Sequence, residues 1–243
     1  TGGSDPWYMK RVVDYILANN AHLIFDADRS YPIGGINPRP PIFTWSIAVF
    51  AMLLEPFFEN GDAVWWAILS LPAIYGSLTI FPVAIIAREH IGQKASVIAA
   101  WLIAFMPAHV SHTTWALADH DAFIMLFITL GFMFWLRAVK YAGTERLVRT
   151  SSATPTAFIA GISAVVEQRK AAFAAAVLAG VSFGIVSLGW KGFVVGPSIL
   201  FLAYAAQVAL NMFRRRDSTT LNVLFLTMLC VNLLMAIPFY AHP

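Results

Sequence analysis

The chain has 243 residues, of which 59% are hydrophobic and only 12% are charged. Its mean hydropathy of +0.70 excludes an ordinary soluble domain of this length and predicts an all-α polytopic membrane protein. The net charge is +3, and because the 16 Lys and Arg residues are scattered through loops, no nucleic-acid partner is expected. A single cysteine, Cys230, excludes an intrachain disulfide. Since the sequence begins at Thr1 without a signal-like segment, we treat it as a fragment.

The first forty residues predict an amphipathic helix followed by a loop. Apolar residues at helical spacing follow Ser4, Asp5 and Pro6, which is a favourable helix start. Asp5 is therefore either a helix cap or a functional carboxylate, and the sequence leaves both open. The segment "DADRSYPIGGINPRPP" contains four prolines and two glycines, which favours a loop. The apolar positions of the helix are Met9, Val12, Val13, Ile16 and Leu17.

Six apolar runs are long enough, or nearly long enough, to cross a hydrocarbon core of roughly 30 Å, which takes about 20 helical residues. A seventh run, Pro41 to Phe57, is marginal because its helix would rise only about 25 Å. The six runs are Ala63 to Ala87, Ala95 to Val110, Ala122 to Val139, Ala172 to Leu188, Phe193 to Met212 and Leu221 to Tyr240.

The distribution of charge predicts that the seventh run lies in the membrane plane. With six spans, eleven of the sixteen basic residues fall on one side of the membrane and nine of the thirteen acids on the other. A seventh span would place Asp5 and Asp119 on opposite sides. We therefore expect residues 1–62 to form a first external loop with two interfacial helices, and residues 63–243 to form the transmembrane domain, with a second external motif at 111–121.

Asp119, His120 and Asp121 lie where one predicted span has ended and the next begins, in the stretch "HTTWALADHDAF". Carboxylates at such a boundary are either solvated span ends or ligands for a hard divalent cation. A D-x-D pair favours a cation, because two like charges that are close raise each other's pKa unless a cation compensates them. Together with Asp5 the pair predicts a Mg²⁺ or Mn²⁺ site, with His120 as a weaker ligand candidate.

Two basic side chains are candidates for an anionic group near this site. His112 precedes Asp119 by about two helical turns, so it either shares a helical face with Asp119 or caps the preceding span. Arg39 is held between two prolines in "NPRPP", where it either faces an anion or is a solvated loop charge.

These features together resemble one family. "GGSDPWYMKR", a proline-rich loop, an in-plane apolar helix, two spans and then "SHTTWALADHDAF" resemble the catalytic subunit of oligosaccharyltransferase in its archaeal or bacterial single-subunit form. The resemblance covers essentially the whole chain. It implies the type C glycosyltransferase (GT-C) membrane fold with external amphipathic helices, in a multi-pass protein of the cell membrane whose catalytic loops lie on the extracytoplasmic face.

The resemblance also implies a reaction and a set of roles. An oligosaccharide would be transferred from a lipid-linked phosphate or pyrophosphate donor, of the dolichol or polyprenol type, to the Asn side chain of an Asn-X-Ser/Thr sequon in an acceptor polypeptide. Asp5 and Asp119 would be catalytic metal ligands and Asp121 a ligand or a close partner of one, with Mn²⁺ or Mg²⁺ as cofactor. His112 and Arg39 would face the donor phosphate or support the ligands.

Two departures from the family pattern matter. His112 occupies the place where relatives usually carry arginine, so its positive charge depends on pH. A later external glutamate and a C-terminal Trp-Trp-Asp-Tyr-Gly motif, expected in a C-terminal soluble domain, are absent from the 243 residues. The chain alone is thus expected to be incomplete for activity.

Two other functions remain open at the level of the sequence. One is a different GT-C enzyme that uses a lipid-phosphate sugar. The other is a divalent-metal or proton-coupled transporter, which is disfavoured because transporters place carboxylates at mid-membrane, whereas these lie at span ends.

Overall fold

A computed structural model describes residues 5–58, 62–116, 119–143 and 155–241 of the chain. The chain divides into two compact units, and each is described by itself. The first comprises residues 1–126 and 188–191, and the second comprises residues 127–187 and 192–243.

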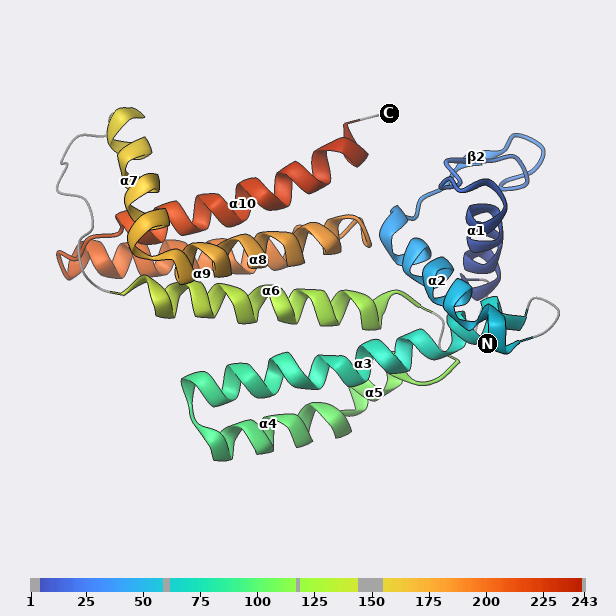
Figure 1. Cartoon of the computed structure of the whole chain (residues 1–243), viewed down its shortest axis with the longest axis horizontal. Helices are drawn as coiled ribbons and strands as arrows, with labels where there is room; N and C mark the ends of the chain where they lie inside the picture. Colours follow the sequence, from blue (N-terminus) through green and yellow to red (C-terminus); the bar gives the residue numbers. More distant parts are fainter. Residues whose placement is uncertain (1–4, 59–61, 117–118, 144–154, 242–243) are drawn as a thin grey trace. The chain divides into compact units, whose positions relative to one another are not determined.

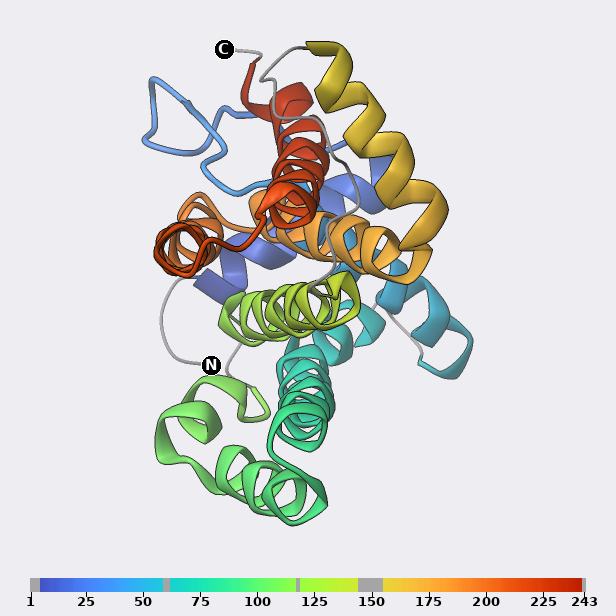
Figure 2. The same cartoon turned by 90° about the vertical axis from the view of Figure 1, so that its left-hand side faces the viewer.

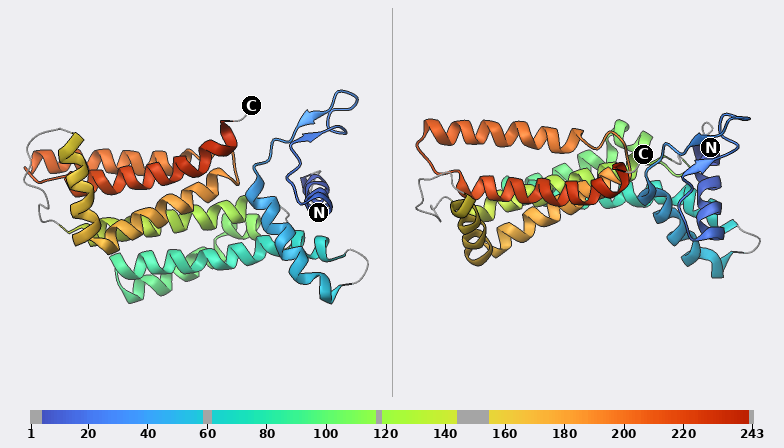
Figure 3. Two further views of the ribbon diagram at one scale, coloured as in Figure 1. Left: turned by 45° about the horizontal axis from the view of Figure 1, so that its top comes forward. Right: turned by 90° about the horizontal axis from the view of Figure 1, so that it is seen from above.

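The first unit begins with the amphipathic helix that the sequence predicts. Helix α1 (Asp5–Asn19) buries Met9, Val12, Val13 and Ile16, each with no exposed surface, and so confirms the 3.6-residue periodicity. The proline-rich segment that follows contains a short antiparallel pair, β1 (Phe25–Asp26) with β2 (Gly35–Ile36), drawn as arrows in Figure 3. Two-residue strands leave no alternating pattern, which is why the sequence predicts only a loop there.

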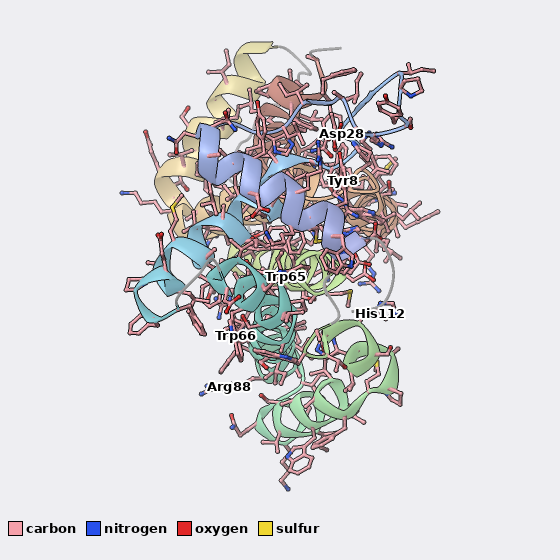
Figure 4. The ribbon with its side chains drawn as sticks, turned by 90° about the vertical axis from the view of Figure 1, so that its right-hand side faces the viewer. Tyr8, Asp28, Trp65, Trp66, Arg88 and His112 are labelled. Atoms are coloured by element: carbon pink, nitrogen blue, oxygen red, sulfur yellow. The ribbon has the colours of Figure 1, made fainter. Side chains whose placement is uncertain are left out.

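A buried carboxylate fastens α1 to this hairpin. Asp26 is 2% exposed and accepts two hydrogen bonds from Arg11, at 3.0 Å from Nε and 2.8 Å from Nη2. Arg11 Nη2 also lies 2.6 Å from Asp28. In Figure 4, Tyr8 and the hairpin residue Asp28 lie on one side of the α1 ribbon, and Trp65 and Trp66 lie on its other side. A bidentate ion pair therefore holds α1 against the hairpin.

Helix α2 (Pro41–Leu54) and the 3₁₀ turn η1 (Glu55–Phe57) form the marginal apolar run. At 14 residues α2 is shorter than the helices that qualify as spans, and its placement in the membrane plane stays a prediction. Its N-terminal end is tied to residues 188–191, because Ile42 N donates to Leu188 O at 2.9 Å.

Helices α3 (Asp62–His90), α4 (Gln93–Phe105) and α5 (Pro107–Thr113) complete the first unit, together with the start of α6 (Asp121–Ala142). The predicted span Ala95 to Val110 is broken, since α4 and α5 meet at an angle of 56°. Pro107 accounts for the break, because a proline cannot continue the helical hydrogen bonds and disfavours helical geometry in Met106 before it.

Helix α5 lies directly on α3. A Cβ atom at Gly76 would be 2.3 Å from Thr113 Cβ, so only glycine permits this approach. Buried His109 is hydrogen-bonded through Nε2 to Gly76 O at 3.2 Å. This contact fixes the helix that carries His112.

The second unit is built from the rest of α6 and from α7 (Pro155–Gln168), α8 (Lys170–Ser187), α9 (Val195–Phe213) and α10 (Thr219–Tyr240). Figure 1 shows α8 and α10 running side by side. Small residues make this possible, since a Cβ at Gly180 would lie 2.6 Å from Met228 O. Phe183 and Met228 are fully buried in the core of the unit.

Among the described residues, five helices are long and apolar enough to cross a membrane, and the bent pair α4–α5 makes six. The five are α3, α6, α8, α9 and α10. Their positions match the predicted spans, so the all-α polytopic fold is confirmed, with the one correction that the second span is broken.

Candidate metal and donor site

Asp119, His120 and Asp121 form the only group of three metal-ligating side chains found in the described part of the chain. One ligand atom from each lies within 4.8 Å of the others, and all three side chains are partly buried. His120 Nδ1 is 2.6 Å from Asp119 Oδ1. The distance defines an ion pair, although the ring N–H is not aligned well enough for a hydrogen bond.

Local structure explains how neighbouring side chains converge. Asp121 is the first residue of α6, so its carboxylate lies at the positive end of the helix dipole. Asp119 precedes the helix, and its Oδ1 accepts a hydrogen bond from His120 N at 2.7 Å. The backbone thus turns between the two carboxylates, and His120 joins the group in place of pointing away from it.

His112 at the end of α5 reaches the same group. Its Nδ1 lies 2.7 Å from Asp121 Oδ2, while its side chain remains 58% exposed. The ion pair exists only when the imidazole is protonated. The sequence left open whether His112 shares a helical face with Asp119 or caps the preceding span, and the structure pairs it with Asp121.

Among the three candidate ligands, Asp119 has a clearly shifted pKa. Interaction with the His120 imidazole holds the pKa of Asp119 below its usual range, and burial acts in the opposite direction. The positive charge of Arg39 also lowers this pKa. Asp119 is therefore ionised and able to bind a cation at neutral pH.

Asp5 does not belong to the three-residue group. It lies in the first turn of α1, and its Oδ1 accepts a hydrogen bond from Arg39 Nη2 at 2.6 Å. Because the Arg39 charge acts on both Asp5 and Asp119, Arg39 connects the two acidic motifs. The structure therefore brings Asp119, His120, Asp121 and His112 together, and it links Asp5 to them through an arginine.

Arg39 is held firmly for a loop residue. Its backbone N–H donates to Asn37 Oδ1 at 3.0 Å, and its carbonyl oxygen lies 3.2 Å from His22 Nε2. The guanidinium lies 5.9 Å from the ring centroid of Tyr8 and its side chain is only 17% exposed. The solvated-loop interpretation of Arg39 is therefore wrong.

A hollow of about 230 Å³ lies beside the group, between the proline-rich segment, α2 and residues 189–191. Arg39, Lys191 and His120 line it, together with the Trp190 ring. The sequence analysis did not include Trp190 and Lys191 among the candidate site residues, although both line this hollow. Lys191 is one of only five basic residues on the side of the membrane that is predicted to carry most of the acids. This unusual position could have indicated a role in binding an anion.

Comparison with known proteins gives the family. A model of the family "Oligosaccharyl transferase STT3, N-terminal" matches residues 2–242. The chain belongs to this family. Among STT3 relatives, it is 28% identical over 98% of its length to dolichyl-phosphooligosaccharide-protein glycotransferase 3 of Archaeoglobus fulgidus. It is 27% identical over 97% of its length to dolichyl-monophosphooligosaccharide–protein glycotransferase AglB of Haloferax volcanii. It spans 26% and 22% of these relatives.

Solved structures of the STT3 family share the fold. The oligosaccharyltransferase AglB of A. fulgidus, in complex with an inhibitory peptide and a dolichol-phosphate, aligns with 98% of this chain at a TM-score of 0.79 and 24% identity. A complex of the A. fulgidus enzyme with Zn and sulfate aligns over the same share at 0.78 and 23%. The chain covers 26% and 27% of those chains. At these identities the likeness establishes the GT-C membrane fold alone.

Proposed function

We propose that this chain supplies the metal-binding and donor-binding part of an oligosaccharyltransferase. The reaction is transfer of an oligosaccharide from a dolichol- or polyprenol-linked phosphate or pyrophosphate to the Asn side chain of an Asn-X-Ser/Thr sequon. The observation that carries the proposal is the convergence of Asp119, His120 and Asp121 within 4.8 Å, in a chain of the STT3 family.

The donor set fits a divalent cation. Two carboxylates and an imidazole are ligands that Mn²⁺ accepts, and Mg²⁺ accepts the carboxylates. Asp119, Asp121 and His120 would hold the ion, with Asp5 as a further ligand if its second oxygen, which the Arg39 bond leaves free, turns toward the group. When bound, the cation would neutralise negative charge on the departing lipid phosphate.

Activation of the acceptor amide would be the role of a carboxylate side chain. The acceptor amide nitrogen is a poor nucleophile because its lone pair is delocalised, and a carboxylate that accepts its N–H hydrogens favours a twisted, more reactive amide. Asp5 is suited to this role because its carboxylate is 62% exposed yet fixed by Arg39. Transfer would form a carbon–nitrogen bond at the sugar and break the sugar–phosphate bond, with the bonding electrons leaving on the lipid phosphate. The nitrogen would lose one proton to a carboxylate such as Asp5 or to the departing phosphate.

The hollow lined by Arg39 and Lys191 is suited to the donor phosphate. Two cationic side chains that converge on one space bind an anion more strongly than either alone, and Trp190 provides an aromatic wall. His112 adds positive charge on the other side of the group when it is protonated.

The test uses the natural full-length protein with a lipid-linked donor and a fluorescent sequon peptide. We expect Asp119→Asn and Asp5→Asn to reduce Mn²⁺-dependent transfer by at least about 10²-fold, the size of effect seen when an electrostatic catalytic group is removed. Asp119→Asn should also weaken Mn²⁺ binding measured by electron paramagnetic resonance, by at least roughly 10-fold, since loss of a group that only supports a ligand already costs about 10- to 100-fold.

The matched control is Asp14→Asn, which removes one carboxylate from the same helix α1 as Asp5. Asp14 is paired only with Lys10 in an exposed ion pair, so this variant should transfer at the wild-type rate. Wild-type transfer by Asp5→Asn or by Asp119→Asn would refute the site assignment. Transfer by the wild-type protein without any divalent cation would refute the metal.

A further inference from the structure

A second polar site lies in the other unit, at the end of the spans where α6 and α9 finish and α10 begins. Figure 2 looks toward this end, with the orange-to-red connection marking the turn from α9 to α10. A hollow of about 260 Å³ opens there between the three helices. Its polar lining residues are Lys140, Gln207, Asn211, Arg216, Asp217 and Thr220.

One buried group in this hollow lacks a hydrogen-bond partner. Thr220 is 7% exposed, and within the described part of the chain its hydroxyl makes no hydrogen bond. A buried hydroxyl without a partner loses its hydrogen bonds to water and gains none in return, so native proteins rarely retain one unless a ligand or water satisfies it. The hydroxyl therefore points to an occupant that accepts hydrogen bonds.

The charged side chains around the hollow determine whether a negatively or a positively charged occupant is favoured. Arg214, Arg215 and Arg216 follow α9 directly, and none of the three takes part in an ion pair with any residue that the structure describes. The carboxylate of Asp217 also lines the hollow, but it accepts hydrogen bonds from Thr219 N and Oγ1, at 3.2 and 2.9 Å. Cationic and hydroxyl donors therefore outweigh the single acid.

The backbone holds this basic turn in a defined shape. Arg215 N donates to Met212 O and Arg216 N donates to Asn211 O, the pair of bonds that closes a helix C-terminus in a Schellman motif. Arg215 has φ of 52°, a left-handed conformation that glycine adopts with less strain. Arg215 thus occupies a position where glycine would be less strained.

Apolar side chains adjoin the basic turn. Met212 is 73% exposed and Phe213 is 88% exposed, at the end of a helix whose span-length segment is only 11% buried. An occupant that touches both groups has a negative head and an apolar body. We propose that this hollow binds the phosphate of an anionic phospholipid from the surrounding membrane, with Arg216 and Thr220 as its principal ligands.

The proposal is independent of the transferase function and is tested by lipid-dependent stability. The natural full-length protein is placed in nanodiscs of phosphatidylcholine, with or without phosphatidylglycerol, and its thermal unfolding midpoint is measured. We expect phosphatidylglycerol to raise the midpoint of the wild type. Arg216→Gln should lose most of this increase and bind the lipid about fivefold more weakly, the contribution of one basic side chain at an anionic surface.

Thr220→Val distinguishes a binding hydroxyl from general electrostatic attraction. Because the variant removes an unsatisfied buried group, its midpoint in phosphatidylcholine alone should be higher than that of the wild type. The increase in its unfolding midpoint caused by phosphatidylglycerol should be smaller than the increase in the wild type. A midpoint below that of the wild type in phosphatidylcholine, with an unchanged gain from phosphatidylglycerol, would overturn the site.

Two controls complete the experiment. Arg88→Gln removes an exposed basic residue from the last turn of α3, in the other unit, and should leave the phosphatidylglycerol effect intact. An equal loss in Arg88→Gln and Arg216→Gln would mean diffuse attraction and would contradict the proposal. Inorganic phosphate added to phosphatidylcholine nanodiscs should cause no increase, and an increase as large as that from phosphatidylglycerol would assign the hollow to free phosphate.

Discussion

At the scale of single residues, paired charges join α1 to the segment that follows it. Arg11 and Asp26 join α1 to the hairpin, and Arg39 and Asp5 join the hairpin end to the start of α1. The side chain of Asp26 is 1% exposed, whereas that of Asp5 is 62% exposed. The first pair therefore contributes to stability, and the second leaves a carboxylate available for chemistry.

The buried pair predicts a dependence of stability on pH. The hydrogen bonds from Arg11 hold the pKa of Asp26 below its usual range. The folded protein therefore binds the Asp26 proton less tightly than the unfolded chain does, whose aspartates have a pKa of about 3.9. The stability from this group is present above that pH and is lost as the pH falls through the folded pKa.

Arg11→Gln tests this pair. At neutral pH the variant should be less stable by about 3 kcal/mol, since it leaves a buried carboxylate without its partner. As the pH falls below about 3.9 the difference from the wild type should shrink, and it should vanish only below the lowered folded-state pKa, where Asp26 is neutral in both proteins. Thermal or denaturant unfolding of both proteins, from neutral pH to below about pH 3.9, measures the difference in stability. Asp14→Asn, which removes the exposed pair of Asp14 with Lys10 on the same helix, should cost no more than about 0.5 kcal/mol.

At the scale of elements, the broken span places the site. Because α5 turns away from α4 by 56° and lies on α3, His112 at its end reaches Asp121 at the start of α6. The contact depends on Gly76, which leaves room for Thr113. An apolar run alone predicts a straight span, whereas Pro107 and a glycine on a neighbouring helix determine the bend.

Gly76→Ala should separate α5 from α3 and destabilise the protein by about 1–3 kcal/mol, the usual cost of overpacking a close contact. Transfer activity should fall as well, since His112 moves with α5. The thermal midpoint and the transfer rate measure the two effects. A double variant, Gly76→Ala with Thr113→Gly, makes room for the added methyl group and should recover both. If Gly76→Ala matched the wild type, the contact would not position the site.

At the scale of the whole molecule, the proposed function requires residues 5, 39 and 119 to lie on one side of the membrane. The charge distribution predicts this arrangement if the run Pro41 to Phe57 does not cross. The structure supports the length argument, since α2 has only 14 residues. Which side is extracytoplasmic remains a prediction from the basic residues, and so does the division of the chain at residue 62.

Cysteine labelling tests the topology. In a Cys230→Ser background, Ser30→Cys and Ser111→Cys should react with a membrane-impermeant maleimide on intact cells. Ile91→Cys and Arg214→Cys should react only after the membrane is permeabilised, because an odd number of spans separates them from the first pair. Labelling of position 30 together with position 91 would mean that the apolar run crosses the membrane.

The sequence by itself determined the membrane class, the positions of the spans, the periodicity of α1 and the acidic motifs, because these are properties of neighbouring residues along one segment. The tertiary structure decided the pairing of Asp5 with Arg39, which are 34 residues apart, and of His112 with Asp121. It also revealed the unsatisfied hydroxyl of Thr220. Such contacts form when separate loops and helix ends meet in space, and no local pattern of residues specifies which side chains will meet.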